Sequence, residues 1–334
     1  MILSLPSPPN LPAHTWRPLR SEDAAALFHL GVDCAPIDGG TSIATIAEWK
    51  AKLEEAGGKL TSDTLCAVDS TGRLAAAAWV TCDDGLAHEY RAFLDGRVHP
   101  DYRGRGLGSF ILQRMETRAR QILAAQKEDR PGVLRFDFYD RSDDALALFE
   151  KYGFRFVFAE CEMRRDLRQP VPITDLPEGM IPVTWSPQRA TQFFDVYQDA
   201  FRERPGFPHW SEEVWRHNFT GHPGFRPDLS ILLLHAAEAV GFAICHVEME
   251  GAKDPAGVGW IVQMGVRTAW RRRGLGSALL NEVMHRFQAD GLASAALEVN
   301  INNRRAMRLY ERLGFERCRR RTSFQKVARE RGCH

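Results

Sequence analysis

One glycine-rich motif occurs twice in this chain, once in each half. The first copy, from Arg103 to Ser109, reads RGRGLGS, and the second, from Arg271 to Ser277, reads RRRGLGS. Each copy follows an apolar segment and begins an amphipathic helical pattern. Glycines at such a junction let consecutive backbone N–H groups point at one ligand, and the helix start adds the positive end of its dipole. The motif therefore predicts a site for a phosphate or pyrophosphate group.

The residues of both motifs are our candidates for contacts with that ligand. They are Val98, Arg103, Gly104, Arg105, Gly106, Leu107, Gly108 and Ser109 in the first half, and Arg271, Arg272, Arg273, Gly274, Leu275, Gly276 and Ser277 in the second. An isolated glycine pair is more often a simple turn or helix start. The repetition favours the phosphate site, because similarity of whole segments reflects architecture.

The surroundings of the motif repeat as well. Val98 and Val266 are 168 positions apart, as are Gly108 and Gly276. Further along, ALALFEKYGF at 145–154 corresponds to AMRLYERLGF at 306–315, with an offset of 161. Both segments read as a helix that ends at a glycine suited to a left-handed cap. Two similar modules are therefore predicted.

The hydrophobic periodicity of each module predicts an α+β fold, a mixed and mostly antiparallel sheet flanked by helices. In the first half we predict helices over Glu22–Leu30, Thr45–Glu55, Gly106–Ala125 and Asp143–Tyr152, and strands over Thr64–Val68, Leu74–Thr81, Leu86–Val98, Val133–Phe138 and Phe154–Leu167. In the second half we predict helices over Pro187–Arg202 and Glu212–Phe219, from Gly274, and over Asn303–Leu313, and strands over Leu229–Ala236, Val240–Glu250, Gly257–Val266 and Ala295–Val299 and from Phe315.

The length of 334 residues exceeds one comfortable hydrophobic core. A proline-rich segment at 169–179 reads as a linker, because closely spaced prolines resist both helix and sheet. We therefore expect an N-terminal domain over 14–168 and a C-terminal domain over 180–334.

Composition excludes several function classes. The 44 Lys and Arg residues are balanced by 43 Asp and Glu residues, which argues against a protein that coats nucleic acid. The seven cysteines have no paired spacing typical of zinc sites, so we expect no metal. The start has no signal-peptide pattern, and the longest apolar stretch, Ile231–Cys245, is interrupted by His235 and Glu238. We expect a cytoplasmic protein without a membrane partner, as a monomer or homodimer.

These motifs resemble those of the GNAT acetyltransferase superfamily, whose signature is Gln/Arg-x-x-Gly-x-Gly/Ala. Arg103-x-x-Gly106-x-Gly108 and Arg271-x-x-Gly274-x-Gly276 both match it. The resemblance covers nearly the whole chain as two tandem modules, and the layout is similar to the mycothiol-synthase-type branch. It implies acetyl-CoA as cosubstrate, with its pyrophosphate on the second loop and its pantetheine along the strand that contains Met264, Gly265 and Val266.

The resemblance also implies a catalytic second half. GNAT enzymes often protonate the leaving thiolate with a Tyr, and Tyr310 matches that position, whereas its counterpart Phe149 has no proton to give. Asn300 and Asn303 resemble asparagines that contact the cofactor, and the first half has Tyr139 and Ser142 instead. On the residues alone, Tyr310 is equally an aromatic on an apolar helix face.

The general base is not defined by one residue. Glu248 and Glu250 alternate with apolar neighbours, so both carboxylates lie on one strand face and are candidates, or they are solvated surface residues. Mycothiol-synthase-like proteins place a Glu five residues before Gly265, where this chain has Trp260. His246 reads as a structural histidine, and an N–H near Met264 or Gly265 is expected to bind the thioester oxygen.

The sequence indicates less about the site that binds the acceptor of the acetyl group. Phe207, His209, Trp210 and Trp215 form either an acceptor pocket or an anchor for helices. The arginines at 317 and 319–321 read as a solvated face, and a nucleic-acid patch is the alternative.

Three functions compete. The favoured one is acetyl-CoA-dependent N-acetylation of a small amine by direct attack in a ternary complex. The alternatives are mycothiol-synthase-like acetylation of a cysteinyl pseudodisaccharide, and a CoA-binding sensor without catalysis.

Overall fold

The computed structural model describes residues 7–38, 45–83, 89–127, 130–139, 143–172, 176–204, 209–249 and 256–329. Contacts divide the chain into two compact units. Unit 1 comprises Met1–Ala159 and Arg321–His334, and unit 2 comprises Glu160–Arg320. Unit 1 is therefore built from two separate stretches of the sequence.

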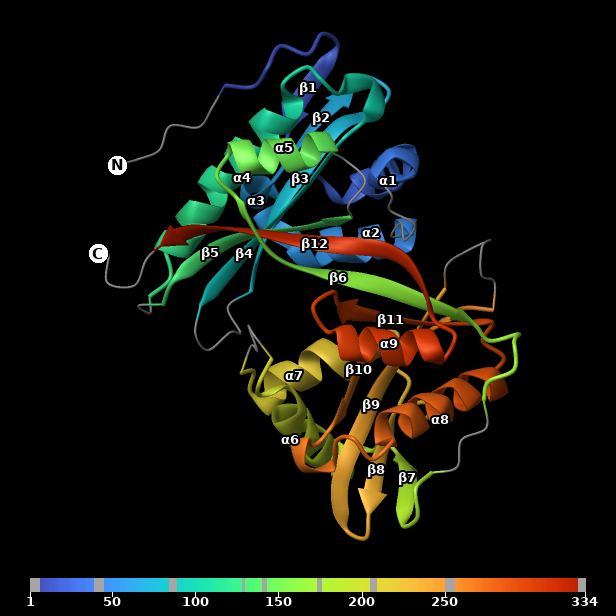
Figure 1. The fold of residues 1–334 in the computed structure, drawn as a ribbon. Helices are drawn as coiled ribbons and strands as arrows, with labels where there is room; N and C mark the ends of the chain where they lie inside the picture. The colour runs from blue at the N-terminus through green and yellow to red at the C-terminus, as the bar shows by residue number, and fades with distance from the viewer. Residues whose placement is uncertain are drawn as a thin grey trace. The chain divides into compact units, whose positions relative to one another are not determined.

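Unit 1 contains a sheet with the order β1-β2-β3-β4-β5, to which the end of β12 is added (Figure 1). Neighbouring strands are antiparallel except β4 and β5, which are parallel. The strands are β1 (His14–Arg17), β2 (Thr64–Asp69), β3 (Leu74–Asp83), β4 (Tyr90–Val98), β5 (Gly132–Tyr139) and β12 (Glu316–Arg329). The helices are α1 (Ala24–Asp38), α2 (Ile46–Ala56), α3 (Leu60–Asp63), α4 (Leu107–Ala124) and α5 (Asp143–Lys151).

Unit 2 repeats this arrangement with the strand order β7-β8-β9-β10-β11-β6. Only the β10 and β11 pair is parallel among these described strands. The strands are β6 (Arg155–Asp166), β7 (Met180–Thr184), β8 (Ile231–His235), β9 (Glu238–Glu248), β10 (Val258–Val266) and β11 (Ser294–Asn300). The helices are α6 (Ala190–Phe201), α7 (Glu212–Phe219), α8 (Leu275–Ala289) and α9 (Arg304–Arg312).

Helices cover both faces of each sheet, as the hydrophobic periodicity predicts. In unit 2, α8 packs Leu279 and Phe287 against one face, together with Leu297 of β11. On the other face, Phe193 of α6 packs with Phe242 of β9. Each sheet therefore lies between two apolar layers, and the predicted mixed α+β class is confirmed.

Most predicted elements are confirmed within a few residues, but α1 continues to Asp38, well past the predicted end at Leu30. The short helix α3 and two short strands were missed. β1 and β7 each pair with only one neighbour and end their sheets. β7 contains Pro182, which cannot donate a ladder hydrogen bond and is tolerated at a sheet edge. Such short edge strands have little periodicity to detect. The prediction for residues 84–88 and for Glu250 lies outside the described residues.

The last strand of each half contributes to the sheet of the other compact unit. Residues Glu160–Asp166 of β6 pair with β11, and residues Arg321–Arg329 of β12 pair with β5. The ranges 14–168 and 180–334 therefore follow the sequence repeat, whereas the contact-based units exchange these strand ends. Strand pairing depends on complementary side chains across the ladder, which sequence order does not reveal.

Ion pairs fix both exchanged strand ends. In unit 1, Asp137 of β5 accepts hydrogen bonds from Arg135 Nε at 3.0 Å and from Arg321 Nη1 of β12 at 3.2 Å. In unit 2, the buried Glu162 of β6 accepts from Arg164 Nε at 2.7 Å and from Arg319. Charge-assisted bonds of this kind specify one strand register.

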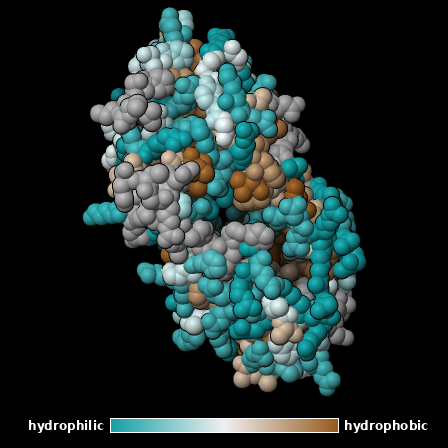
Figure 2. Space-filling model, turned by 60° about the vertical axis from the view of Figure 1, so that its left-hand side comes forward, coloured by the Kyte–Doolittle hydropathy of each residue, from teal (hydrophilic) through white to brown (hydrophobic). Residues whose placement is uncertain are grey.

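The surface is mainly hydrophilic on the face that Figure 2 shows, where hydrophobic side chains form only small patches. No helix among the described residues is both long and apolar enough to cross a membrane.

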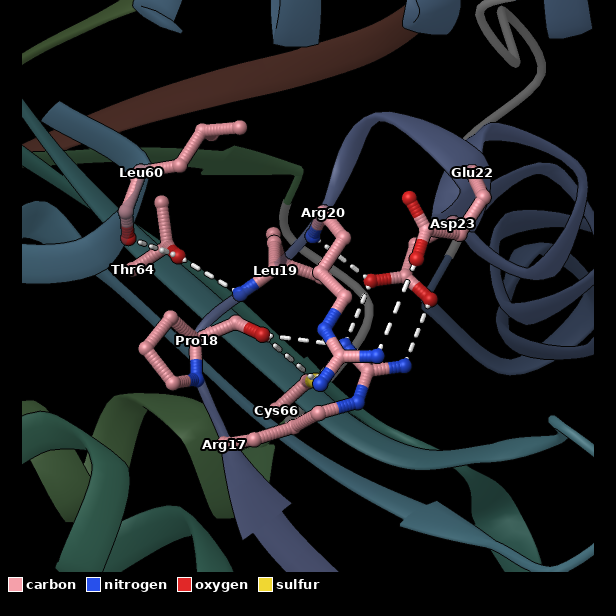
Figure 3. Close-up of polar contacts among 9 residues, drawn as sticks. All are labelled: Arg17, Pro18, Leu19, Arg20, Glu22, Asp23, Leu60, Thr64 and Cys66. Atoms are coloured by element: carbon pink, nitrogen blue, oxygen red, sulfur yellow. Dashed lines mark hydrogen bonds and ion pairs between the residues drawn. The ribbon is translucent and has the colours of Figure 1, made fainter. Parts of the chain in front are cut away.

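Figure 3 shows an ion pair that joins β1 to the start of α1 in unit 1. Arg17 Nη1 and Nη2 donate to the two carboxylate oxygens of Asp23 at 2.7 and 2.8 Å, and the Arg20 amide donates to Asp23 at 2.8 Å. Burial alone would raise the pKa of Asp23, but the hydrogen bonds from Arg17 and Arg20 outweigh it and lower the pKa.

We predict that Asp23→Asn lowers the free energy of unfolding by about 2 kcal/mol at pH 7, because it leaves the largely buried Arg17 guanidinium without its counter-ion. A lowered carboxyl pKa stabilises the fold above the ordinary Asp pKa, and this stabilisation disappears as the pH falls through the folded-state value. Urea unfolding at pH 7 and at acid pH should therefore show a difference between wild type and variant that shrinks in acid.

Glu22→Gln is the matched control for this measurement. Glu22 pairs with Arg20 at 3.7 Å, but both side chains are exposed, so little stability should be lost. Equal losses in the two variants would contradict the role of the Arg17 and Asp23 pair.

Candidate functional site

The two parallel strands of unit 2 separate along their length. β10 pairs with β11 at Val258, Gly259 and Trp260, and Trp260 faces Ala296 in the last described pair. Beyond it, β10 continues to Val266 beside β9, while β11 continues to Asn300 beside β6. The strands therefore leave an opening between them that begins after Trp260.

Unit 1 has the same opening. β4 pairs with β5 from Tyr90 to Phe93, and Phe93 faces Arg135 in the last described pair. β4 then continues to Val98 beside β3 alone. The duplication therefore includes the opening as well as the glycine-rich loop.

Backbone groups of β10 point into the opening. The Arg267 N–H donates to the Val240 oxygen at 2.9 Å, so position 267 bonds to β9. Bonding alternates along an antiparallel ladder, so Gly265 also points at β9, whereas Met264 and Val266 point away from it. Of the two candidates for binding the thioester oxygen, Met264 is the one whose N–H faces the opening.

A β-bulge distinguishes β10 from β4. The register of β10 against β9 shifts between Ile261 and Gln263, so Val262 is an extra residue. The ladder between β3 and β4 continues without such a shift from Ala76 to Asp83. Bulges re-aim neighbouring backbone and side-chain groups, so the two openings present different groups to a ligand.

The loops at the end of β4 and β10 have the same backbone conformation. Gly104 and Gly106 have φ values of 72° and 80°, and Arg272 and Gly274 have φ values of 65° and 79°. This left-handed conformation at alternate positions turns backbone N–H groups to one side. Arg272 holds it despite its side chain, a strain typical of functional loops.

The start of α8 offers free space as well as N–H groups. The Ser277 and Ala278 amides donate to the Gly274 oxygen at 3.0 and 3.2 Å. The amides that precede them at the start of the helix have no acceptor within the helix. A Cβ added at Gly276 would meet only Leu309, at 3.5 Å. The geometry fits a phosphate group lying on the helix end.

The first arginine of each motif has a structural role. Arg103 forms two hydrogen bonds of 2.9 Å with Asp38 of α1, and Arg271 donates to the Ala200 oxygen of α6 at 2.7 Å. These side chains hold each loop to the first long helix of its own module. Both guanidinium groups are therefore held by the protein itself, although the motif places Arg103 and Arg271 among the candidate ligand contacts.

The third arginine lies on an aromatic ring in both motifs. Arg105 is 5.4 Å from the Tyr102 ring centroid, and Arg273 is 4.7 Å from that of Trp270. Arg272 is exposed. Arg272 is thus the guanidinium of the second loop that can move toward an anion.

Asn303 caps the start of α9, and Asn300 closes the turn that precedes it. The Asn300 side-chain oxygen accepts from the Asn302 N–H at 2.9 Å, and that of Asn303 accepts from the Ala306 N–H at 3.1 Å. Their counterpart Tyr139 ends β5, and Ser142 lies outside the described residues.

Tyr310 lies on the face of α9 that packs into the core. Its ring centroid is 6.0 Å from that of Phe315, and it contacts the core cluster of α8 and β11. Its hydroxyl makes no hydrogen bond to a described residue. Burial of the ring raises the pKa of Tyr310 to about 12, so the phenol keeps its proton at physiological pH.

Phe149 occupies the equivalent place in unit 1 within an aromatic cluster. Its ring stacks on Phe136 at 4.5 Å and lies 6.1 Å from Phe324. This site offers no proton donor at the position of Tyr310.

Glu248 lies outside the opening. It pairs with Val258, two residues before the strands separate and roughly 17 Å along β10 from Met264. Glu250 lies outside the described residues. The register therefore does not favour Glu248 as the base.

Glu298 is a carboxylate that sequence reasoning missed. It is exposed and lies on β11 two residues beyond Ala296, at the edge of the opening. It alternates with Leu297 and Val299, which face the α8 and α9 core, so Glu298 faces the α6 and α7 side. The repeat held the signal, because the equivalent residue in the first half, Asp137, is also acidic.

His246 and Trp215 both have structural contacts. His246 is buried, bonds the Phe219 oxygen at 2.8 Å and stacks on His222 at 4.5 Å. Burial lowers the pKa of His246 to about 4. Trp215 is fully buried and donates to Gln263 of β10 at 2.8 Å, which anchors α7 to the sheet.

The rest of the predicted aromatic pocket is only partly described. Trp210 packs on Phe219 at 5.7 Å, His209 has a φ of 49°, and Phe207 lies outside the described residues. In the described part of the chain, no group of three or more His, Cys, Asp or Glu side chains is arranged to hold a metal.

Two family models match the chain. The model of the acetyltransferase (GNAT) family matches residues 190–315, and that of the acetyltransferase (GNAT) domain matches residues 61–156. The matches fall on the two halves of the repeat and include both loops.

Characterised relatives are similar over much of the chain. A mycothiol acetyltransferase of Thermobispora bispora is 32% identical over 224 residues, which cover 66% of this chain and 71% of that protein. A mycothiol acetyltransferase of Streptomyces griseus is 27% identical over 322 residues, 94% of this chain and 96% of that protein.

Solved structures share the fold. A GCN5-related N-acetyltransferase from Sphaerobacter thermophilus has a TM-score of 0.77 and 27% identity over 98% of both chains. A tandem GNAT protein from the clavulanic acid biosynthesis pathway has a TM-score of 0.69 and 18% identity, over 94% of this chain and 98% of that one.

Proposed function

Because the chain belongs to the acetyltransferase (GNAT) family and is an N-acetyltransferase, we propose that it transfers an acetyl group from acetyl-CoA to the amine of a small molecule. The proposed catalytic module is 180–334, and 14–168 is a related module without chemistry. The proposal rests on one difference between the two units. Unit 2 has Tyr310 and Glu298 near its opening and loop, whereas unit 1 has Phe149 in place of Tyr310.

The second loop fits the coenzyme pyrophosphate. The α8 N–H groups and the Arg272 side chain supply positive charge, and Gly276 leaves room for the phosphates. The N–H and C=O groups of Met264 and Val266 would bond the pantetheine amides as a neighbouring strand would. Asn300 and Asn303 would bind through their side-chain N–H groups, since their side-chain oxygens already accept backbone N–H groups.

Bound acetyl-CoA supplies the thioester to be attacked. The Met264 N–H donates to its carbonyl oxygen, where negative charge develops. Glu298 accepts the proton that the amine nitrogen loses as the new C–N bond forms, and Tyr310 gives its proton to the sulfur as the C–S bond breaks. The products are an N-acetyl amine and CoA thiol. Direct attack in a ternary complex needs no covalent enzyme intermediate.

The acceptor approaches from the α6 and α7 side of the sheet, which Glu298 faces. Trp260 borders the same place, and its indole N–H is buried without a described hydrogen-bond partner. A buried donor of this kind suits an acceptor with an oxygen near its amine. The mycothiol precursor is the first amine to test, because relatives are mycothiol acetyltransferases.

Loop variants should separate the two modules. Gly276→Glu puts a carboxylate into the second cradle and should abolish acetyl-CoA turnover by repulsion and loss of space. Gly108→Glu is the matched control, because its Cβ would meet only Leu148 at 3.4 Å, and it should leave turnover intact. Thiol release gives the rate, and equilibrium titration gives the number of cofactors bound. Turnover that survives Gly276→Glu but not Gly108→Glu would reverse the assignment of modules.

Tyr310→Phe should lower kcat by roughly 10²-fold or more with unchanged affinity for acetyl-CoA, because it removes a proton donor but keeps the ring. Since the pKa of about 12 keeps the phenol protonated, wild-type kcat should not fall through titration of Tyr310 below about pH 11. Stopped assays across the pH range measure kcat, and titration of the protein with acetyl-CoA measures the affinity. A variant with wild-type kcat at every pH would remove Tyr310 from the mechanism.

Glu298→Gln should lower kcat/KM for the amine by about 10²-fold with acetyl-CoA affinity unchanged, because it removes the proton acceptor and keeps the shape of the side chain. Glu298→Asp should recover part of the rate. Glu248→Gln is the control and should behave as wild type, because of its position outside the opening. If Glu248→Gln lowered kcat/KM for the amine more than Glu298→Gln, Glu248 of β9 would be the general base instead.

A further inference from the structure

The arginines at the start of β12 line a groove with arginines of α9, within unit 2. The groove has a volume of about 570 Å³. Five arginines and one carboxylate surround it: Arg304, Arg308, Arg317, Arg319, Arg320 and Glu311. This arrangement differs from the solvated face that the sequence favours, because side chains from two elements converge on one volume.

Carboxylates neutralise only part of this charge. Arg317 Nη2 pairs with Glu311 at 2.7 Å, and Arg319 pairs with the buried Glu162. Three positive charges stay in excess when both carboxylates are counted. Like charges held around one concave volume repel each other, and an anion in that volume relieves the repulsion.

The groove also has an apolar floor. Cys161 and Met307 are each 6% exposed, and Ile301 lies beside them. A volume of this size suits a small organic molecule, and arginine forks match phosphate oxygens with two parallel hydrogen bonds.

The groove and the coenzyme cradle lie on different flanks of α9. Leu309 faces Gly276 of the cradle. Arg304, Arg308 and Glu311 lie roughly 100–160° around the helix from Leu309, given 3.6 residues per turn. The groove is therefore separate from the loop that the proposed function assigns to pyrophosphate.

We propose that this arginine groove binds a small phosphate-bearing molecule at a second site, distinct from that of acetyl-CoA. Arg304 and Arg308 make no ion pair with a described residue, so both guanidinium groups can turn toward the ligand. Arg317 and Arg319 are held by Glu311 and Glu162 and set the shape of the groove.

The test is titration of the full-length protein with inorganic pyrophosphate, in saturating CoA so that the cradle is filled, at physiological ionic strength. We expect saturable binding that weakens at least tenfold in Arg304→Ala/Arg308→Ala, because the variant loses the two guanidinium groups that can form charge-assisted hydrogen bonds with the ligand. Arg305→Ala is the control, since it removes one positive charge from exposed α9 surface outside the groove and should change the affinity for pyrophosphate less than twofold.

A second readout uses Cys318, an exposed thiol that lines the groove. Pyrophosphate should slow its alkylation, read at Cys318 by mass spectrometry, in wild type but not in the double variant. The expected affinity for acetyl-CoA is the same in all variants, which keeps this test independent of the proposed function.

Several results would overturn the proposal. They are absence of saturable pyrophosphate binding, equal losses in the Arg305 control and the double variant, competition between pyrophosphate and CoA for one site, and tighter binding of a single-stranded RNA oligonucleotide. The last result would identify the groove as part of a nucleic-acid surface.

Discussion

The separation of β10 from β11 is the constraint on which the site depends. A sheet normally satisfies its backbone N–H and C=O groups by pairing, and those of Met264 and Val266 point where β11 has moved away. These groups are left to bond a ligand or water. Glu298 of β11 is exposed, and Tyr310 packs against the core cluster of α8 and β11.

The two modules keep the same scaffold and differ in reactive groups. Arg103 and Arg271 both tie their loop to the first long helix, and Arg105 and Arg273 both lie on an aromatic ring. Such contacts maintain loop geometry whatever chemistry follows. The bulge at Val262 belongs only to β10, so the half with Tyr310 also has the re-aimed strand.

Exchange of strand ends changes how the duplication is understood. Each compact unit takes its last strand from the other half of the sequence, and Asp137 and Glu162 pair with arginines that fix those strands. A cut in the linker at 169–179 would therefore not yield two complete sheets. The two modules repeat each other in sequence, but neither forms its complete sheet without a strand from the other half.

The amino-acid sequence determined the fold class, the elements, both loops and the family, because periodicity, glycines and spacing are local properties that repeat along the chain. It also made Tyr310 the candidate proton donor, from its neighbours in a helical motif. Tertiary structure alone decided that Arg271 is an anchor, that Glu298 replaces Glu248 as the carboxylate at the opening, and that strand ends are exchanged. These depend on register and on contacts between distant segments, and a shift of one residue reverses the face of every side chain in a strand.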